Sequence, residues 1–488
     1  MKSRSQNQQS SAQKAAAVRT PLRKTVAGGK AGASAAKNRP PQGRTSSASA
    51  GRAVPEKPFA AMPRRKGPVM MASGIAARVD SETPMVSLPA PAIVTARRSH
   101  KPRLLWIGDA CVPTGFATVT HAVLQHLAAD WDVVVSGVNY EGGAHDFPYT
   151  VMPARQGGDM WGINRFKEVC AEFAPAAVVI NNDWWNVAKF ARAAPAGVPV
   201  VAYMPVDGGN LDPADMRALK KLRAAVWYTD FGHREAVKAG FKGARHVIPH
   251  GIDPALFHPA SRTEARRLLD LNVPKNAFIV GNLNRNQPRK RLDLTVQIFA
   301  DWVRRHHVSN AFLLMHCAQK DSGWDLRRVA AFHGVADRLL LTGGEGMGDM
   351  QGTRHLQLIY SSLDVQVSTT LGEGWGLTTM EGMACGVPQI VPESSALAEW
   401  AVPAAKVPCS RMLMHPEICT TGALVDDGPF VSALHSLYLD KARREEMSAA
   451  GLALVRQDGF QWKTVAGQFH QILVSTLRRR RARQLATA

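Results

Sequence analysis

The chain has 488 residues, of which 45% are hydrophobic, so it is long and apolar enough for two domains, yet no run of eighteen apolar residues would span a membrane. The six cysteines show neither a C-x-x-C pair nor metal-ligand spacing, which excludes a disulfide framework and predicts reduced thiols in a cytoplasmic protein. The net charge of +21 comes mostly from the two ends of the chain, so it does not indicate a DNA-reading surface on the globular part.

Residues 1–100 form a basic tail with 18 lysines and arginines against three acidic residues. They are rich in Ala, Ser, Gly and Pro and lack hydrophobic periodicity, which predicts disorder. A second basic run, Arg478 to Arg481 and Arg483, lies near the C-terminus. Such ends are either solvated or contact a polyanion or an anionic membrane surface. Contact with a membrane surface would make the protein peripheral to a membrane. The Ser- and Arg-rich start also loosely suits a transit peptide.

Between residues 101 and 260, short apolar runs alternate with helical stretches. The strands predicted from these runs are 103–108, 131–138, 176–181, 198–204 and 224–229. Strands that alternate with helices are typical of a parallel sheet covered on both faces. The Pro- and Gly-containing segment VIPHGIDPALFHP (247–259) is predicted to link this N-terminal domain to the next one.

A second series of the same kind fills residues 261–460. Its predicted strands are 277–283, 311–317, 338–343, 363–369 and 387–392, with helices at 291–306, 324–334, 353–362 and 377–385. A last helix is expected at 461–481, within the C-terminal helix and basic tail at 461–488. The chain is thus predicted to hold two Rossmann-like, doubly wound α/β domains that face a cleft at the carboxyl ends of their strands.

Two turns after predicted strands carry residues suited to phosphate. Gly115 opens the helix after the first strand, where free N–H groups and a positive dipole end suit an anion, although it could simply permit a tight turn capped by Thr114. Arg285 and Lys290 follow the strand at 277–283, and their cations suit diphosphate oxygens. Charge alone does not separate them from their neighbours Arg289 and Arg291.

The stretch GEGWGLTTMEGMACGVP (372–388) joins a strand to a helix through a glycine-punctuated turn. Gly372, Gly374 and Gly376 would let backbone amides approach a ligand closely. Two acids, Glu373 and Glu381, accompany them. Thr378 and Glu381 also match a capping box, which would give Glu381 a purely structural role.

The glycine-rich segment GGEGMGDM (343–350) lacks the order of a dinucleotide fingerprint and a helix at the right offset. We expect it to be a flexible loop at the rim of the cleft, with backbone groups that could touch a nucleotide base. The chain also lacks a Walker A lysine motif.

Taken together, these motifs resemble the retaining glycosyltransferases of GT-B architecture, in their large family four. The hallmark of that family is two glutamates separated by seven residues in an E-G-[FW]-G-L…E-[AG]-M-A-x-G-x-P segment, which matches 373–388. The family also has an arginine and a lysine five residues apart, and these match Arg285 and Lys290. The match selects Lys290 over its neighbours. The linker 247–259 and the segment around Tyr360 and Asp364 are also similar to the family's. The resemblance covers about 101–475 and is strongest in the C-terminal half.

The resemblance implies a role for each matched position. Arg285 and Lys290 would hold and neutralise the donor diphosphate, Glu373 would bind the transferred sugar, and Glu381 would accept hydrogen bonds from the ribose. The amides of Gly374, Trp375, Gly376 and Leu377 would contact sugar or phosphate, and Gly115 would face the diphosphate from the other domain.

The chain departs from the family where many members carry a histidine near the anomeric carbon. Here YMPVDGG and NNDWWN supply Asp207 or Asp183, and Asp207 is the preferred catalytic candidate. Both acids could instead cap loops or helices. His250, in the linker, and His121, inside a helix, are weaker candidates.

The sequence therefore predicts a retaining glycosyltransferase that moves a sugar from a nucleotide-diphosphate sugar to the hydroxyl of an acceptor it does not identify. The donor is a substrate, no separate cofactor is expected, and cations in place of a metal would support the leaving group. Two alternatives stay open: a nucleotide-sugar epimerase of the same fold, and a polyanion-binding protein with a degenerate core.

Overall fold

The structure is a computed structural model that describes residues 101–346, 353–415 and 418–487, with side chains as far as Arg478. The predicted tail 1–100 lies outside the described residues, as do the side chains of the basic run after Arg478. The described residues belong to one compact unit.

The N-terminal domain is built on a six-stranded parallel sheet in the order β3-β2-β1-β4-β5-β6. Leu105, in the centre of the sheet, lies opposite Val134 on one side and Val178 on the other. The strands are β1 (Arg103–Asp109), β2 (Asp132–Val138), β3 (Thr150–Pro153), β4 (Ala177–Asn181), β5 (Val200–Met204) and β6 (Ala224–Trp227).

Helices cover both faces of this sheet because its strands are apolar on both sides. Along β1, Leu104 and Trp106 pack into one core cluster, while Leu105 and Ile107 pack into another that includes Phe166. The helices are α1 (Gly115–Leu127), α2 (Phe166–Phe173), α3 (Trp184–Ala193), α4 (Pro213–Ala218) with the 3-10 turn η1 (Leu219–Lys221), and α5 (Asp230–Lys238).

The C-terminal domain repeats the plan with strand order β12-β11-β10-β7-β8-β9. Its strands are β7 (Phe278–Asn282), β8 (Ala311–Met315), β9 (Leu339–Leu341), β10 (Val365–Val367), β11 (Gln389–Pro392) and β12 (Ala405–Val407). Its helices are α6 (Arg262–Leu268), α7 (Leu292–Arg305) after the 3-10 turn η2 (Pro288–Lys290), α8 (Leu326–Phe332), α9 (Thr353–Ser361), α10 (Leu377–Ala384), α11 (Ser395–Trp400), α12 (Asp427–Leu439) and α13 (Lys441–Val455). Two doubly wound sheets were predicted, and both are present.

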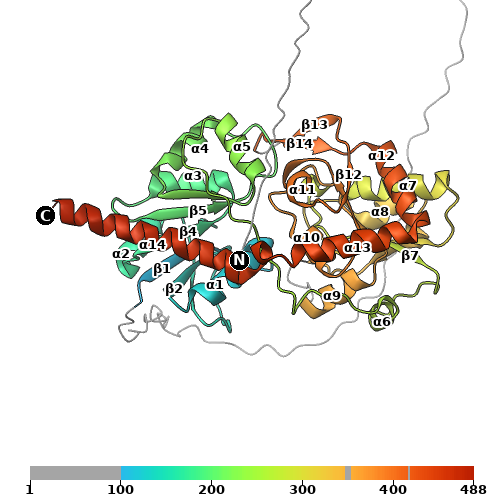
Figure 1. Ribbon diagram of the computed structural model, residues 1–488, viewed down its shortest axis with the longest axis horizontal. Coiled ribbons are helices and arrows are strands. Elements are labelled where there is room, and N and C mark those ends of the chain that lie inside the picture. Colours follow the sequence, from blue (N-terminus) through green and yellow to red (C-terminus); the bar gives the residue numbers. More distant parts are fainter. Residues whose placement is uncertain (1–100, 347–352, 416–417, 488) are drawn as a thin grey trace, which may run out of the picture. The chain divides into compact units, whose positions relative to one another are not determined.

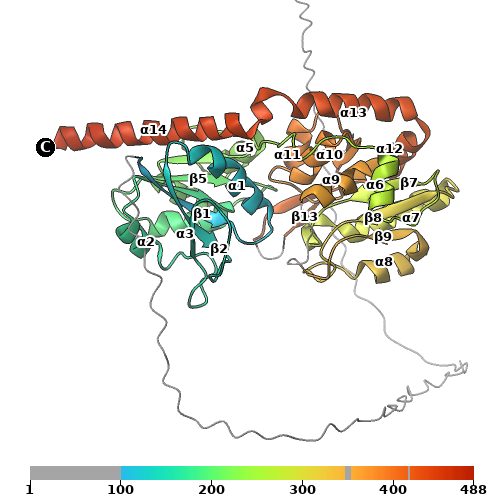
Figure 2. The ribbon, with the colours of Figure 1, turned by 90° about the horizontal axis from the view of Figure 1, so that it is seen from below.

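The last helix, α14 (Trp462–Thr487), returns to the N-terminal domain, where it lies beside α1 (Figures 1 and 2). Phe469 packs edge-on against Trp106 of β1 and against Tyr203 of β5, with ring centroids 6.1 and 4.8 Å apart. The C-terminal helix therefore completes the core of the first domain. Within the described residues, no helix combines the length and the apolar character that crossing a bilayer requires.

Four short strands were not predicted. Two of them, β13 (Arg411–Met414) and β14 (Thr421–Leu424), form an antiparallel hairpin. All four residues of β13 are exposed, so the strand has no alternation of buried and exposed side chains by which to recognise it. The other two, β3 and β12, are edge strands of three or four residues.

Candidate active site

The carboxyl ends of strands from the two domains approach each other through glycines. A Cβ atom on Gly372, in the turn after β10, would lie 1.7 Å from the carbonyl oxygen of Asp207, which follows β5. On Gly374 it would lie 2.3 Å from Cβ of Pro205. Any larger residue at these two positions would separate the loops, so the glycines are required for the close approach.

Four charged side chains meet where the loops touch, and we call Asp207, Arg289, Lys290 and Glu373 the charged cluster. Nε of Arg289 lies 3.1 Å from the Asp207 carboxylate, and its Nη1 lies 3.6 Å from Glu373. Nζ of Lys290 lies 2.5 Å from Oε1 of Glu373. Lys290 and Glu373 are both buried, so their charges are only weakly screened by water.

Burial and the neighbouring Arg289 cation lower the pKa of Lys290 to about 8, although the Glu373 carboxylate opposes this. Burial alone would raise the pKa of Glu373, but the cations Lys290 and Arg289 hold it below its usual range. The cluster therefore keeps an ionised glutamate beside a lysine that a further anion would stabilise in its charged form.

Arg285, predicted to act together with Lys290, forms a different pair. Its guanidinium bonds the Asp321 carboxylate at 2.6 and 3.2 Å and is partly exposed. Burial alone would raise the pKa of Asp321, but the bonds from Arg285 and Ser322 hold it low. The charge of Arg285 also reaches Asp109 at the end of β1. Among the described residues no bond joins Arg285 to the charged cluster.

Helix α1 begins opposite the start of α10. Thr114 caps α1 by accepting a bond from the N–H of Ala117 at 3.2 Å, and its own hydroxyl donates to Asp109 at 2.7 Å. A Cβ atom on Gly115 would lie 3.3 Å from Leu377 of the other domain. The two predicted contact positions, Gly115 and Leu377, are therefore neighbours.

Helix α10 begins at Leu377, and Gly376 is its N-cap, with a φ of 94° that favours glycine. Thr378 and Glu381 are thus inside the helix, and the capping-box interpretation is wrong. Glu381 instead accepts a hydrogen bond from the hydroxyl of Tyr360 at 2.7 Å. Burial raises the pKa of Glu381 to about 7, against the effect of that bond.

The side chain of Trp375 belongs to the core, which leaves only its backbone for a ligand. Its ring stacks on Trp400 with centroids 4.8 Å apart.

His250 also lies in this core: its Nδ1 is 2.7 Å from the hydroxyl of Tyr203, and burial lowers its pKa to about 3. The ring of His121 bonds the carbonyl of Ala110 and the hydroxyl of Tyr149. Both histidines therefore already have structural partners.

Three carboxylates lie at the carboxyl ends of neighbouring strands of the N-terminal sheet: Asp109 is the last residue of β1, Asp183 follows β4 and Asp207 follows β5. Asp183 occupies the N-cap position of α3 without making a side-chain capping bond. Burial raises its pKa to about 7, and the charges of Asp207 and Asp109 add to this while Arg289 opposes it. Asp207 is the one that pairs directly with Arg289, so the two candidates lie close to each other but differ in their partners.

Sequence reasoning missed Arg289, because the resemblance favoured Lys290 over its neighbours. The structure brings both into the charged cluster.

The glycine-rich segment 343–350 is described only as far as Gly346: Gly344 and Glu345 accept backbone bonds from Gln319 and Lys320 at 3.0 and 2.7 Å. The remainder of that segment lies outside the described residues.

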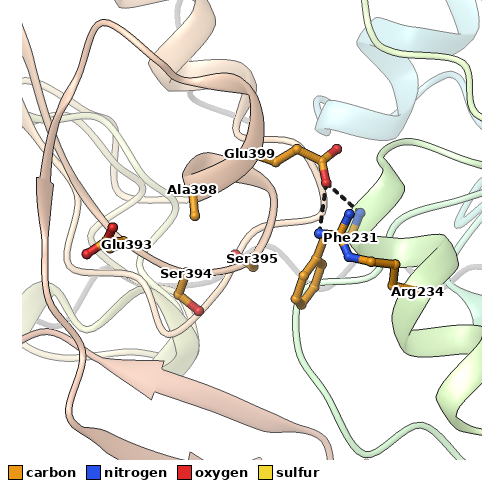
Figure 3. Close-up of a pocket in the computed structure, with 7 residues that line it drawn as sticks. All are labelled: Phe231, Arg234, Glu393, Ser394, Ser395, Ala398 and Glu399. Atoms are coloured by element: carbon orange, nitrogen blue, oxygen red, sulfur yellow. Dashed lines mark hydrogen bonds and ion pairs between the residues drawn. The ribbon is translucent and has the colours of Figure 1, made fainter. Parts of the chain in front are cut away.

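A second contact between the domains lies beside this site (Figure 3). The Glu399 carboxylate of α11 accepts bonds from the backbone N–H groups of Asp230 and Phe231, at the start of α5, at 2.8 and 2.7 Å. Arg234 adds a bond at 3.2 Å. Phe231, Arg234 and Glu399 line a cavity of about 410 Å³. Ser395, also in its lining, connects it to the site because its Oγ accepts from the N–H of Glu373 at 2.9 Å.

Comparison with known proteins gives one family match. Residues 274–426 match the family described as glycosyl transferases group 1. The D-inositol 3-phosphate glycosyltransferase of Geodermatophilus obscurus is 29% identical over 231 residues, which cover 42% of this chain and 48% of that protein. The lipopolysaccharide core biosynthesis mannosyltransferase LpsB of Rhizobium meliloti is 32% identical over 161 residues, covering 31% of this chain and 42% of that protein. The chain thus spans less than half the length of either relative.

Solved structures match over more of the chain. Sucrose-phosphate synthase from Thermosynechococcus elongatus superposes with a TM-score of 0.60 at 18% identity, covering 77% of this chain and 99% of that one. HepE from Anabaena, in complex with UDP-glucose, gives a TM-score of 0.60 at 15% identity, covering 77% of this chain and 100% of that one. At such identities the likeness shows the fold alone.

The matched residues 274–426 contain three of the four members of the charged cluster as well as Glu381. The chain as a whole has the GT-B fold, and residues 274–426 of its C-terminal domain match the family described as glycosyl transferases group 1.

Proposed function

We propose that the protein is a retaining glycosyltransferase that moves a sugar from a nucleotide-diphosphate sugar to an acceptor hydroxyl. The observation that carries this proposal is the buried Lys290–Glu373 pair, with Arg289 beside it, where the strand ends of the two domains meet. Ligands of open α/β sheets bind at such strand ends. The match of residues 274–426 to glycosyl transferases group 1 supports the same activity.

In this proposal the donor diphosphate lies among Lys290, Arg285 and the start of α1 at Gly115. Lys290 supplies a compact charge, and Arg285 offers a planar fork once its bonds to Asp321 are shared with phosphate oxygens. The free N–H groups at the start of α1, which is the positive end of the helix dipole, point at the same anion. Arg289 adds a third cation that sequence reasoning did not select.

The two glutamates serve hydroxyl groups on either side of the diphosphate. Glu373, ionised beside Lys290, accepts from hydroxyls of the transferred sugar, and Glu381 accepts from the ribose while Tyr360 holds it in place. The backbone N–H groups of Gly374, Trp375, Gly376 and Leu377 contact sugar or phosphate oxygens. The required φ of Gly376 fixes the direction of that turn.

The chemical step breaks the bond between the anomeric carbon and the phosphate oxygen, whose electron pair stays on the leaving diphosphate. The acceptor oxygen bonds to the same face of the anomeric carbon, and its proton passes to the departing phosphate. Cations already in place stabilise the charge that develops there, without a separate cofactor or metal. Asp207 contacts the sugar from the N-terminal domain and orients Arg289, while Asp183 beside it is the second candidate.

The proposal is tested with a panel of UDP-, GDP- and ADP-sugars, scored by release of nucleotide diphosphate in the presence of an acceptor extract. The names of similar proteins include a mannosyltransferase and a protein bound to UDP-glucose, so the panel includes mannose and glucose donors. Lys290→Ala protein is the control for contaminating hydrolases. No release above that control with any donor would reject transfer.

Two further arms separate the alternatives. Inversion of the donor sugar without an acceptor would identify an epimerase. A protein trimmed to residues 101–477 should retain turnover, whereas a polyanion-binding protein that acts through its basic ends would lose its function. The same assays would identify the sugar and the acceptor. Repeated on fractionated cells, they would test the cytoplasmic setting that we propose for the reaction.

A further inference from the structure

A second cavity, of about 760 Å³, lies in the N-terminal domain. It is at the amino-terminal end of a strand, whereas the candidate active site is at the carboxyl ends of the strands. It is lined by Ala224 and Ala225, the first two residues of β6, whereas the active-site loops follow the last residues of the strands. Residues of α4, η1 and the segment after α5 complete its wall. The cavity is therefore distinct from the donor site.

The wall of this cavity is strongly basic. Its lining contains no aspartate or glutamate, and its cationic residues are Arg217, Lys220, Arg223, Lys238 and Lys242, with His246 beside them. Most of the chain's net positive charge lies in its two ends, so this concentration stands out on a globular part that is otherwise near neutral. A one-signed lining of this kind focuses the electrostatic potential and attracts anions.

Nearby acids do not neutralise Arg217, Lys220 or Lys242. Glu235 pairs with Lys238 at 2.6 Å, and Asp215 pairs with Arg192, on the neighbouring helix α3, at 2.5 Å. Arg217, Lys220 and Lys242 have neither an ion pair nor a side-chain hydrogen bond within the part of the chain that the structure describes, and all three are exposed. Three cations are thus available to a ligand.

The ends of helices explain only some of this charge. The carbonyl ends of η1 and α5 lie here, and cations near such ends stabilise a helix within its last turn. Lys220 fits that explanation, whereas Lys242 lies four residues beyond α5.

The segment that carries Lys242 has a fixed shape. Gly240 has a φ of 94°, and a Cβ atom on Gly243 would lie 2.2 Å from the ring of Phe241. The ring itself is buried against Trp227, with centroids 5.4 Å apart. The backbone on both sides of Lys242 is therefore held in the wall of the cavity.

We propose that this cavity binds a phosphomonoester, held by Arg217, Lys220 and Lys242. The guanidinium of Arg217 can form two parallel bonds with phosphate oxygens, and the two lysines add charge-assisted bonds from the other sides. The same phosphate chemistry occurs on soluble phosphorylated metabolites and on phosphatidic acid. This site is independent of donor binding and of transfer.

The test compares two matched triple variants of the full chain. The first is Arg217→Gln with Lys220→Gln and Lys242→Gln. The control removes the same charges elsewhere, as Arg456→Gln with Lys167→Gln and Lys275→Gln, which are exposed and make no ion pair within the described residues. Thermal melts establish that both variants are folded. Because both keep the basic ends of the chain, any difference between them belongs to the cavity.

Two probes distinguish the sources of the phosphate. Glycerol 3-phosphate is titrated by calorimetry in the Lys290→Ala background, which weakens phosphate binding at the donor site. Phosphatidylcholine vesicles with and without phosphatidic acid are used in co-sedimentation. The cavity variant should bind one of these probes about tenfold or more weakly than the control variant, and the affected probe names the source.

Donor turnover should be equal in the two triple variants, so failure of this proposal is separable from failure of the proposed transferase activity. Equal binding of both probes by the two variants would overturn the phosphomonoester site. Absence of binding to either probe by the unmutated protein would overturn it too, and would leave the cations the role of complementing helix ends.

Discussion

The guanidinium of Arg289, in the C-terminal domain, lies 3.1 Å from the carboxylate of Asp207, in the N-terminal domain. The same guanidinium reaches Glu373, which holds Lys290. Without a donor, the cations that suit a diphosphate are thus satisfied by carboxylates from both domains. A bound diphosphate would replace carboxylates as the partner of these cations and release acceptor oxygens for sugar hydroxyls, so one exchange of partners would serve both halves of the donor.

We expect Lys290→Ala to lower turnover by about 10² or more, because it removes a preorganised charge from the leaving group. The control is Lys320→Ala. Lys320 also forms a 2.5 Å pair, with Glu345, but both partners are about three-quarters exposed. Such a pair contributes little, so turnover should change less than twofold. Steady-state kinetics decide, and equal losses in the two variants would contradict the role of Lys290.

Replacement of Asp207 should cost more activity than replacement of Asp183. Asp207→Asn weakens the hold on Arg289 and removes the proposed contact with the sugar, so kcat/KM should fall by about 10². Asp183→Asn keeps Arg289 in place and should cost about tenfold or less. The measurement is kcat/KM for both variants with one donor. The reverse order would assign the catalytic role to Asp183.

Both sheets and the charged turn could be predicted from the sequence, because buried parallel strands are apolar runs and their order along the chain fixes where the strand ends lie. The partners of the charged residues could not. Arg285 and Arg289 are equally basic in sequence, yet one pairs with Asp321 and the other with Asp207, in the opposite domain. Such pairings depend on how the domains meet, which local periodicity does not contain. Glu381 shows the same limit: its capping-box pattern was correct as a pattern, but the helix begins two residues too early for it.

Glu381→Gln should weaken binding of the nucleoside diphosphate while stabilising the unliganded protein above neutral pH. The folded-state pKa of Glu381, about 7, lies above its ordinary value of 4.5, so the folded protein holds the proton more tightly than the unfolded chain does. Stability contributed by this group is therefore full below pH 4.5 and declines as pH rises to about 7, by roughly 3 kcal/mol at most.

Glutamine cannot ionise, so the difference between the two proteins should grow across that pH window and stay constant above it. Denaturant titrations from pH 4 to 9 measure the difference, and nucleotide titration measures the affinity. A variant that binds nucleotide with unchanged affinity would remove Glu381 from the ribose site.

Gly372→Ala should impair turnover without unfolding either domain. An added Cβ atom would lie 1.7 Å from the carbonyl of Asp207, so the loops that bring Asp207 to Arg289 must separate. We expect kcat to fall by about tenfold or more, since misplacement by 1 Å is costly in catalysis. Gly428→Ala is the control, because nothing lies within 4 Å of its added Cβ atom. Far-ultraviolet circular dichroism should be unchanged in both variants.

The contact between Glu399 and the start of α5 should set how readily the two domains come together. Glu399→Ala leaves two backbone N–H groups and Arg234 without their shared partner. Since hydrogen bonds to a charged group contribute about 1.5 to 3 kcal/mol, the domain contact should weaken even though no donor-binding residue has changed. We expect KM for the donor to rise and protease sensitivity of the linker 247–259 to increase, with Glu446→Ala, on the exposed surface of α13, as the control. Wild-type values of both quantities in Glu399→Ala would show that this contact does not set how readily the domains come together.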